Sequence, residues 1–506
     1  MNKSCKNCDL DFVITEEDLK FYDNISPVFA KEKIQIPPPT LCPDCRQQRR
    51  ISWRNERALH IRECSKTGKR MLSMYSQECK FPVYDNDQWW SDNWDAMDKG
   101  RDFDFDKTFF EQIAELRDEV PHFALAINKP TMQNSDYCNH SGYLKNCYLI
   151  FNSDNAERCL YSKGTNHCFD CLDCQKVYES ELLYECANCY NCHTCVHLYD
   201  SQNCSDCHHS QSLIGCQHCF LSSNLRNKKF YFKNQACTEE EYKKKVMENK
   251  EIHPPVDFYK YMDENNTENC TGNYLVNCKN CQHCFDCENL ENSKYCFDLK
   301  KGEAISHNNY DISAFGMGVI DCYECCTAGY NDNHILFSEN VWESNDVHYS
   351  LMCMQNCKDC FGCVSLKKKQ YCIFNKQYSK EEYQKLVPKI IEHMKTTGEW
   401  GEFFPTKISP FKYQDAVAQE YYPQEPIVDY KGKAFKFQES EQEFYGKMNL
   451  AKPTEGPDCR HLKRLKTRLP RKLSEQKCAK CSSDITTAQP KERKTFCYDC
   501  YTSSLT

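Results

Sequence analysis

The sequence predicts a mainly β protein with some α-helix, in which zinc ribbons at both ends flank a duplicated cysteine-rich array, solenoid-like and closed by helical caps. Three observations predict it. The 506 residues include 40 cysteines, most of them in Cys-x-x-Cys pairs; the central cysteines recur every twelve residues; and two central segments match at a constant offset. Two thiolates separated by two residues reach one ion from a single tight turn, so bound metal is the first expectation.

The chain divides into seven expected segments. They are an N-terminal zinc ribbon with a basic helix (1–60), an aromatic and acidic α+β segment (61–136), a first array with its capping helix (137–250), a second array with its capping helix (251–395), an extended arm rich in aromatics and proline (396–458), a basic linker (459–477) and a C-terminal zinc ribbon (478–506).

The pairs at the two ends have the spacing of zinc ribbons. The expected ligands are Cys5, Cys8, Cys42 and Cys45 at one end and Cys478, Cys481, Cys497 and Cys500 at the other. In the C-terminal set, 15 residues separate the pair Cys478 and Cys481 from the pair Cys497 and Cys500, a spacing that suits two knuckles on a short β-hairpin. In the N-terminal ribbon 33 residues intervene, so an insertion carrying a helix near Thr15–Lys20 is expected. Four thiolates leave no vacant position, which indicates structural rather than catalytic zinc.

The central segments 219–246 and 360–387 match at an offset of 141 residues, which aligns Asn234 with Asn375. In each segment Thr or Ser is followed three residues later by Glu, as in Thr238-x-x-Glu241 and Ser379-x-x-Glu382. This capping-box pattern begins a helix, and we expect one helix to close each array.

Within the first array one cysteine row repeats every twelve residues from Cys147 to Cys219, with Leu183 in the one open step. A narrow coil that turns a corner about every three residues satisfies both this period and the Cys-x-x-Cys spacing. The lattice is weaker in the second array, where Cys322, Cys325 and Cys326 leave it. The central cysteines expected to bind metal are Cys168, Cys171, Cys174, Cys186, Cys189, Cys192, Cys195, Cys204, Cys207, Cys216, Cys219, Cys278, Cys281, Cys284, Cys287, Cys357, Cys360 and Cys363.

Several zinc ions are the expected cofactor. Two runs of four cysteines at three-residue steps, from Cys186 and from Cys278, resemble bacterial ferredoxin ligands, but neither ends in Cys-Pro, so iron–sulfur clusters are the less favoured alternative. Two Cys-x-x-Cys-His strings match haem attachment, yet most pairs lack the histidine and coincidence explains them better. Histidines such as His348 are candidates to replace a thiolate. The isolated cysteines Cys64, Cys79, Cys237 and Cys459 are expected to be buried thiols.

Composition indicates a reducing cytoplasm. Met1–Phe12 contains no apolar run of a signal peptide, and no later stretch approaches the roughly 18 apolar residues of a membrane span, so no membrane contact is expected. Closely paired cysteines in that compartment are metal ligands more often than disulfides. A secreted array stapled by disulfides stays the alternative, since an even number of cysteines, 40, does not exclude complete pairing. With only 40% apolar residues and a mean hydropathy of −0.79, metal ligation replaces part of the usual core.

Basic segments beside the ribbons suggest contact with RNA, DNA or a nucleoprotein. The residues expected to contact nucleic acid are Arg46, Arg49, Arg50, Arg54, Lys463, Arg464, Lys466, Arg468, Arg471 and Lys472. The competing interpretation is ordinary solvated surface, which the net charge of −8 supports.

The aromatic and acidic segment predicts an amphipathic strand at Asp102–Asp106 and a helix near Thr108–Asp118. Nothing there supplies a nucleophile or a phosphate loop, so neither an enzyme nor a small-molecule substrate is expected. The sequence gives no oligomeric state.

Four motifs are specific enough to compare with known families: Pro37-Pro-Pro-Thr-Leu-Cys-Pro-Asp-Cys-Arg46, Trp89-Trp-Ser-Asp-Asn-Trp94, Gln370-Tyr-Cys-Ile-Phe-Asn-Lys-Gln-Tyr378 and Gly398-Glu-Trp-Gly-Glu-Phe-Phe-Pro405. They resemble the uncharacterised cysteine-rich zinc-ribbon proteins of candidate-phyla (Patescibacteria-type) bacteria. The resemblance implies cytoplasmic zinc binding with ribbons around a cysteine array, and it brings no established activity with it. We therefore expect a non-enzymatic multi-zinc scaffold that contacts nucleic acid or a nucleoprotein through its basic ends. An iron–sulfur electron-transfer protein and a metal store are the alternatives.

Overall fold

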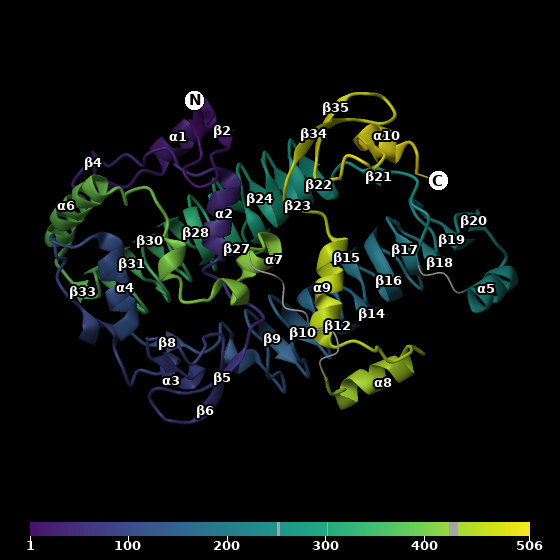
Figure 1. The fold of residues 1–506 in the computed structure, drawn as a ribbon, viewed down its shortest axis with the longest axis horizontal. Coiled ribbons are helices and arrows are strands. Elements are labelled where there is room, and N and C mark those ends of the chain that lie inside the picture. The colour runs from purple at the N-terminus through teal and green to yellow at the C-terminus, as the bar shows by residue number, and fades with distance from the viewer. Residues whose placement is uncertain (250–252, 301, 425–433, 506) are drawn as a thin grey trace. The chain divides into compact units, whose positions relative to one another are not determined.

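The computed structural model describes residues 1–249, 253–300, 302–424 and 434–505 (Figure 1). The chain forms two compact units, and each unit is built from two separate stretches of sequence. Unit 1 consists of Met1–Ala124 with Glu264–Glu425, and unit 2 of Leu125–Asp263 with Pro426–Thr506. Each array thus forms a unit with one end of the chain.

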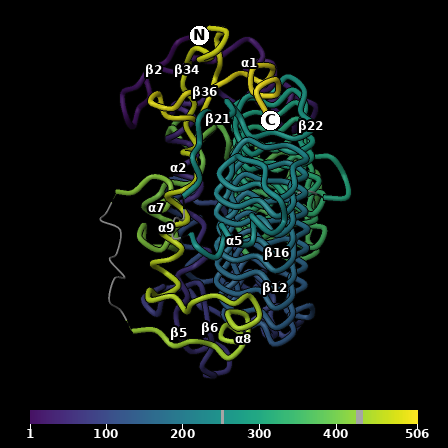
Figure 2. Tube along the Cα trace, turned by 90° about the vertical axis from the view of Figure 1, so that its right-hand side faces the viewer, coloured from purple at the N-terminus to yellow at the C-terminus, as the bar shows by residue number. Residues whose placement is uncertain are grey.

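The first array lies in unit 2 and is a mainly parallel β-solenoid. Its strands are β9 Gly142–Lys145, β10 Asp154–Glu157, β11 Lys163–Asn166, β12 Cys168–Leu172, β13 Gln175–Tyr178, β14 Glu181–Tyr184, β15 Ala187–Tyr190, β16 His193–Gln202, β17 His208–Gln211, β18 Gln217–Phe220, β19 Lys229–Phe232 and β20 Gln235–Ala236. Neighbouring strands pair with an offset of twelve residues, as Ala156 pairs with Cys168. The stacked coils are visible around β12 and β16 in Figure 2, so the predicted solenoid-like array is confirmed.

A left-handed backbone corner at every third residue explains the period. Successive corners at Leu149, Asn152 and Asn155 have φ of 53°, 51° and 55°. The residue after each corner points into the coil, as buried Ile150 and Ser153 do. Four inward positions per twelve-residue coil reproduce the cysteine rows of the sequence. Asn, Asp and His recur at the corners, and Asn, Asp and His are the non-glycine residues most tolerant of positive φ.

The second array, in unit 1, is built the same way with unequal coils. Its strands are β22 Glu264–Glu268, β23 Gly272–Lys279, β24 Cys284–Glu291, β25 Phe297–Leu299, β26 Ser306–His307, β27 Tyr310–Phe315, β28 Tyr323–Ala328, β29 Asn333–Leu336, β30 Asn345–His348, β31 Lys358–Phe361, β32 Gln370–Ile373 and β33 Lys376–Gln377. Lys358 pairs with Gln370, twelve residues on, but Tyr310 pairs with Tyr323, thirteen residues on. The extra residue moves Cys325 and Cys326 off the twelve-residue lattice.

A helix follows the last hairpin of each array, as predicted. α5 (Glu239–Glu248) begins at Thr238 and α6 (Lys380–Thr397) begins at Ser379, both with complete capping boxes. The aligned asparagines make equivalent bonds. The side-chain carbonyl of Asn234 accepts from the Ser223 amide at 2.8 Å, and that of Asn375 accepts from the Val364 amide at 2.8 Å. These equivalent contacts support the internal duplication.

The remaining elements of unit 1 precede and follow its array. They are β1 Asn2–Ser4, β2 Asp11–Val13, α1 Glu16–Asn24, β3 Val28–Phe29, β4 Glu32–Lys33, α2 Pro43–Ile51, β5 His60–Glu63, β6 Arg70–Ser73, β7 Val83–Tyr84, α3 Asn86–Trp90, η1 Ala96–Lys99, α4 Phe109–Glu119, β8 His122–Phe123, η3 Thr406–Ile408, η4 Tyr413–Asp415 and α7 Val417–Tyr421. The helices predicted near Thr15 and Thr108 are confirmed as α1 and α4. The strand predicted at Asp102–Asp106 is wrong: no strand forms there, and Phe103 is buried while Phe105 is exposed.

The remaining elements of unit 2 lie mostly toward the C-terminus. They are η2 Lys129–Thr131, β21 Tyr259–Lys260, α8 Glu439–Lys447, α9 Pro457–Thr467, β34 Ser474–Lys477, β35 Asp484–Thr487, β36 Thr495–Phe496 and α10 Tyr498–Thr502. Part of the segment expected as a basic linker is thus helix α9. We call residues 457–505 the C-terminal module. Its strand β36 pairs with β21, which follows α5 in the chain, and the Tyr501 hydroxyl donates to Oδ1 of Asn224 in the first array at 3.1 Å.

Candidate metal centres

The N-terminal cluster joins a hairpin knuckle to the start of a helix. Cys5 and Cys8 lie in the turn between β1 and β2, while Cys42 caps α2 and Cys45 lies in its first turn. The Sγ atoms of Cys8 and Cys42 are 3.7 Å apart, and all four sulfurs lie within 4.8 Å of one another.

The C-terminal cluster repeats this plan. Cys478 and Cys481 lie between β34 and β35, and Cys497 caps α10, which contains Cys500. The Sγ atoms of Cys481 and Cys497 are 3.7 Å apart, and the four sulfurs again lie within 4.8 Å of one another. The sequence predicted both knuckles on a hairpin. That detail is wrong, because the second knuckle of each cluster begins a helix.

The donor set fits a tetrahedral metal ion. Zn–S bonds of about 2.3 Å place two sulfurs of one tetrahedral site about 3.8 Å apart, close to the distances above. The Cys42 amide donates to Sγ of Cys5 at 3.2 Å, and the Cys497 amide to Sγ of Cys478 at 3.3 Å. Although burial opposes it, such backbone hydrogen bonds lower the pKa of Cys5 and of Cys478 to about 6. The thiolate form that a metal requires is thereby favoured at these two positions, whereas burial raises the pKa of Cys45 to about 11 and that of Cys500 to about 12.

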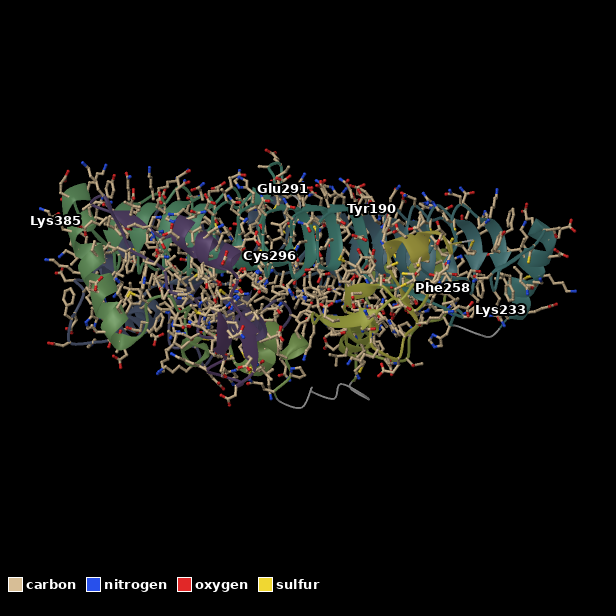
Figure 3. The ribbon with its side chains drawn as sticks, turned by 90° about the horizontal axis from the view of Figure 1, so that it is seen from above. Tyr190, Lys233, Phe258, Glu291, Cys296 and Lys385 are labelled. Carbon is tan, nitrogen blue, oxygen red and sulfur yellow. The ribbon has the colours of Figure 1, made fainter. Side chains whose placement is uncertain are left out.

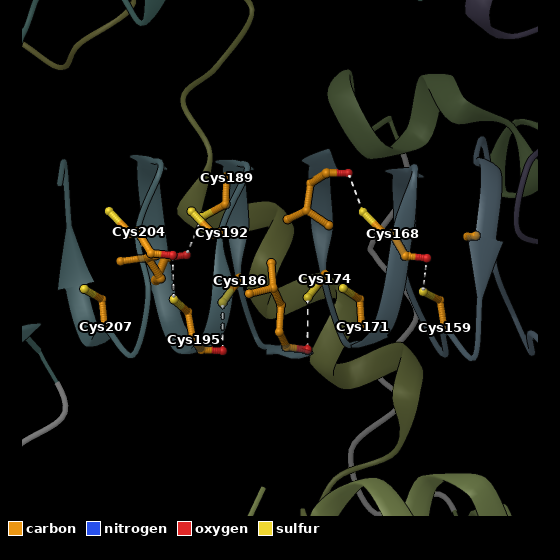
Figure 4. Packing of buried hydrophobic residues seen from close by; sticks show 14 of the residues in the cluster. Cys159, Cys168, Cys171, Cys174, Cys186, Cys189, Cys192, Cys195, Cys204 and Cys207 are labelled. Atoms are coloured by element: carbon orange, nitrogen blue, oxygen red, sulfur yellow. Dashed lines mark hydrogen bonds between the residues drawn. The ribbon is translucent and has the colours of Figure 1, made fainter. Parts of the chain in front are cut away.

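The central cysteines have a different environment. Most of these thiols are buried and donate to a backbone carbonyl of their own coil, and many also contact a carbonyl of the next coil. The Cys159 thiol, for example, lies 3.5 Å from the Glu157 carbonyl and 3.6 Å from the Cys168 carbonyl. Figure 4 shows these bonds repeated from coil to coil. We call this arrangement the cysteine ladder. Burial raises the pKa of the Cys284 and Cys287 thiols well above the ordinary value, which keeps these two thiols neutral.

The predicted metal role of the central cysteines does not fit this geometry. In the described chain, no three of their sulfurs belong to a metal-sized group of the kind that the two terminal clusters form. The cysteines concerned are Cys168, Cys171, Cys174, Cys186, Cys189, Cys192, Cys195, Cys204, Cys207, Cys216, Cys219, Cys278, Cys281, Cys284, Cys287, Cys357, Cys360 and Cys363, each at most 2% exposed. They occupy buried core positions of the stacked coils. All 40 cysteines are free thiols.

Four of the arginines expected to contact nucleic acid are buried. Arg46, Arg50, Arg54 and Arg464 are at most 2% exposed. Arg46 Nη2 lies 2.8 Å from Asp311 Oδ2, and Arg50 Nη1 lies 3.0 Å from both Asp311 Oδ1 and Glu324 Oε2. Arg46 and Arg50 cannot reach a phosphate, because helix α2 directs both side chains onto the second array.

Helix α9 makes the same contact with the first array. Arg464 Nη1 and Arg460 Nε each lie 2.8 Å from an oxygen of Asp173, which is fully buried. The guanidinium of Arg46 stacks over Tyr295 at 5.2 Å, and that of Arg460 over Tyr161 at 5.1 Å. We call these two networks the arginine clamps. Sequence reasoning missed them, although a shared Pro-Asp-Cys-Arg-x3-Arg motif, from Pro43 and from Pro457, was a visible signal.

The other predicted basic residues differ in exposure. Arg49 is also engaged, with Glu324 at 3.1 Å and Glu402 at 2.6 Å. Arg468 donates to Asn188 at 2.9 Å, and Arg471 is 8% exposed. Lys463, Lys466 and Lys472 are exposed. A shallow hollow of about 560 Å³ on the C-terminal module adds further cations, since its lining includes Lys477, Lys491, Arg493 and Lys494 beside Glu475 and Glu492.

Comparisons with known proteins give no family. No family model matches the chain, and no curated protein matches it significantly. One solved structure, described as "putative acetyltransferase from Desulfovibrio desulfuricans G20", shares 8% identity at a TM-score of 0.10. It covers 46% of this chain, and this chain covers 65% of its length. A likeness this low carries no argument. Among the described residues, no helix is both long and apolar enough to cross a membrane.

Proposed function

We propose that the protein is a non-enzymatic scaffold of the reducing cytoplasm, stabilised by one structural zinc ion in each terminal cluster. The observation that carries the proposal is that each cluster supplies four sulfurs within 4.8 Å of one another. Four thiolates complete a tetrahedron and leave no position for substrate or activated water. The cysteine ladder then serves as a packed thiol core, which needs reducing conditions to persist.

Zinc in the N-terminal cluster has a direct role in assembling unit 1. Cys42 and Cys45 bracket the first turn of α2, and Arg46 and Arg50 of the same helix enter the arginine clamp on the second array. A metal that fixes the start of α2 therefore also fixes the direction in which both guanidinium groups point. Metal binding and docking of this helix are coupled in this proposal.

Single substitutions test the zinc assignment. Full-length protein with Cys497→Ser is expected to lose one of two zinc ions per chain, measured by elemental analysis after purification without added metal. The matched control is Cys237→Ser, because Cys237 lies in the same unit but outside both clusters. Iron with stoichiometric sulfide would contradict the proposal, as would unchanged zinc content in the Cys497 variant.

A second candidate function, contact with RNA or DNA, is favoured by the exposed cations of the C-terminal module. Its exposed lysines include Lys466, Lys472 and Lys477, and the module carries the basic hollow described above. Lysines that contact phosphates release counterions from the nucleic acid, so the affinity for RNA or DNA must fall steeply as the salt concentration rises.

Binding of single-stranded RNA as a function of salt tests this candidate. The combined variant Lys477→Ala, Lys494→Ala is expected to weaken binding at least fivefold and to reduce the salt slope by about 1 to 2. Lys243→Ala is the control, since Lys243 on α5 pairs with Glu239 in the same unit. No binding by the wild-type protein at low salt, or an equal loss in the control, would refute the candidate.

A further inference from the structure

Two histidines and an aspartate meet on neighbouring coils of the second array. His334 lies on β29, and Asp346 and His348 lie on β30. One ligand atom from each side chain lies within 4.8 Å of the other two. His334 Nδ1 is 2.8 Å from Asp346 Oδ1, and the two imidazole rings are 5.0 Å apart and nearly perpendicular, at 88°. The three ligands come from two adjacent coils of one unit, and the hydrogen bonds between the paired strands β29 and β30 hold them in register.

The unusual member of this group is His348. It is only 2% exposed, and neither of its ring nitrogens has a hydrogen-bond partner among the residues that the structure describes. Phe29 packs edge-on to its ring at 6.4 Å. Burying an imidazole without a hydrogen-bond partner is unfavourable, because its ring nitrogens lose their hydrogen bonds to water and gain none in return. An ion pair between His334 and Asp346 explains those two residues but leaves His348 unexplained.

The second nitrogen of His334 has the contact that a metal-binding histidine commonly makes. Nε2 lies 2.8 Å from the Ile25 carbonyl oxygen, so it carries the proton and donates it. Nδ1, 2.8 Å from Asp346 Oδ1, holds a second proton in the ion pair, and a metal ion bound by Nδ1, Asp346 and His348 takes the place of that proton. A backbone carbonyl that fixes the ring and tautomer in this way is a usual outer contact of a histidine ligand.

We propose that His334, Asp346 and His348 bind a divalent transition-metal ion of the zinc type. Two imidazoles and one carboxylate suit Zn²⁺ or Co²⁺, whereas Mg²⁺ and Ca²⁺ prefer oxygen ligands alone. Three protein ligands leave one position open. Asp346 is 42% exposed at its side chain, so that position faces solvent and can hold water or an exchangeable ligand. This site differs from the two closed thiolate clusters and is expected to bind metal more weakly.

Cobalt alone is the probe that separates this site from the clusters. The full-length protein, purified with zinc in both clusters and dialysed against a weak chelator, is titrated with Co²⁺ while its visible spectrum is recorded. Cobalt with nitrogen and oxygen ligands gives weak d–d bands, whereas cobalt in a thiolate site adds intense sulfur charge-transfer bands. We expect one equivalent of the first kind per chain.

Three variants decide the assignment. His348→Gln is expected to abolish the signal, and Asp346→Asn to weaken Co²⁺ binding at least tenfold. Asp359→Asn is the matched control, because Asp359 is the carboxylate at the equivalent corner of the next coil and lies outside the group. This substitution is expected to change the affinity for Co²⁺ less than threefold. Since Asp346 is half-exposed, its variant answers the question even where His348→Gln misfolds. Only thiolate bands, no uptake, or equal affinity in wild type and Asp346→Asn would overturn the proposal.

Discussion

Replacing Arg50 by Met is expected to destabilise unit 1 by about 3–5 kcal/mol. Arg50 is fully buried and makes two ion pairs at 3.0 Å, with Asp311 and with Glu324. Removing one partner of a buried pair leaves uncompensated charge, and such changes cost about 3–5 kcal/mol. Here Arg46 still faces Asp311 at 2.8 Å, so the lower half of this range is the better expectation.

Tryptophan fluorescence during urea unfolding measures this effect in the right unit. All six tryptophans, at positions 53, 89, 90, 94, 342 and 400, belong to unit 1. With a slope of about 3 kcal/mol/M, a loss of 3–5 kcal/mol lowers the midpoint by about 1–1.7 M.

The control for Arg50 is Lys385→Met, which removes the same charge from an exposed position on α6 of the same unit (Figure 3). It should change the free energy of unfolding by no more than about 0.5 kcal/mol. Equal midpoints for the two variants would refute the assignment of Arg50 to a structural clamp. They would reopen its interpretation as a surface contact for nucleic acid.

Three further predictions concern the thiol core, acid stability and metal removal. Cys195→Ala, at a fully buried ladder position, should cost about 1–2 kcal/mol by urea unfolding followed by circular dichroism, with zinc per chain unchanged; a loss of zinc would contradict the ladder. Burial lowers the pKa of His197 and of His208 to about 4. The unfolded imidazoles take up protons near pH 6.5 but the folded ones only near pH 4, so unit 2 should lose stability as the pH falls through this window, by up to about 3 kcal/mol per histidine. Hydrogen exchange of residues 193–211 at pH 7 and pH 4.5 measures this loss, which His197→Phe should reduce and His193→Gln, at an exposed site, should not. Chelation of the N-terminal cluster should increase exchange along α2 and expose buried Trp53, reversibly on adding zinc; unchanged exchange in α2 would disprove the coupling of metal and docking.

The sequence predicted the features that depend on local spacing. Cys-x-x-Cys pairs located both terminal clusters, the twelve-residue rows located the solenoid, and the capping boxes at Thr238 and Ser379 located α5 and α6. Each of these signals lies within a few residues or within one coil. Local chemistry fixes such features, so they can be recognised without knowledge of the rest of the chain.

The features that the sequence did not reveal depend on distant partners. Arg46 and Asp311 are 265 residues apart in the sequence, and Arg50 and Glu324 are 274 residues apart. The basic segment that the sequence predicted to lie on the surface is therefore buried in an arginine clamp. The ladder escaped prediction for another reason. A three-residue cysteine spacing is equally compatible with sulfurs gathered on an ion and with sulfurs distributed over successive corners, and only the left-handed corners decide between them.

Elemental analysis of the full-length protein, combined with a count of reactive thiols in denaturant, tests the central claim most directly. The account predicts two zinc ions per chain that resist a weak chelator and negligible iron and sulfide. It also predicts 32 of the 40 thiols reactive before zinc is released, with the other eight appearing only when a strong chelator removes the metal. Stoichiometric iron and sulfide, or many more than eight thiols protected by metal, would contradict it and assign the metal to the array.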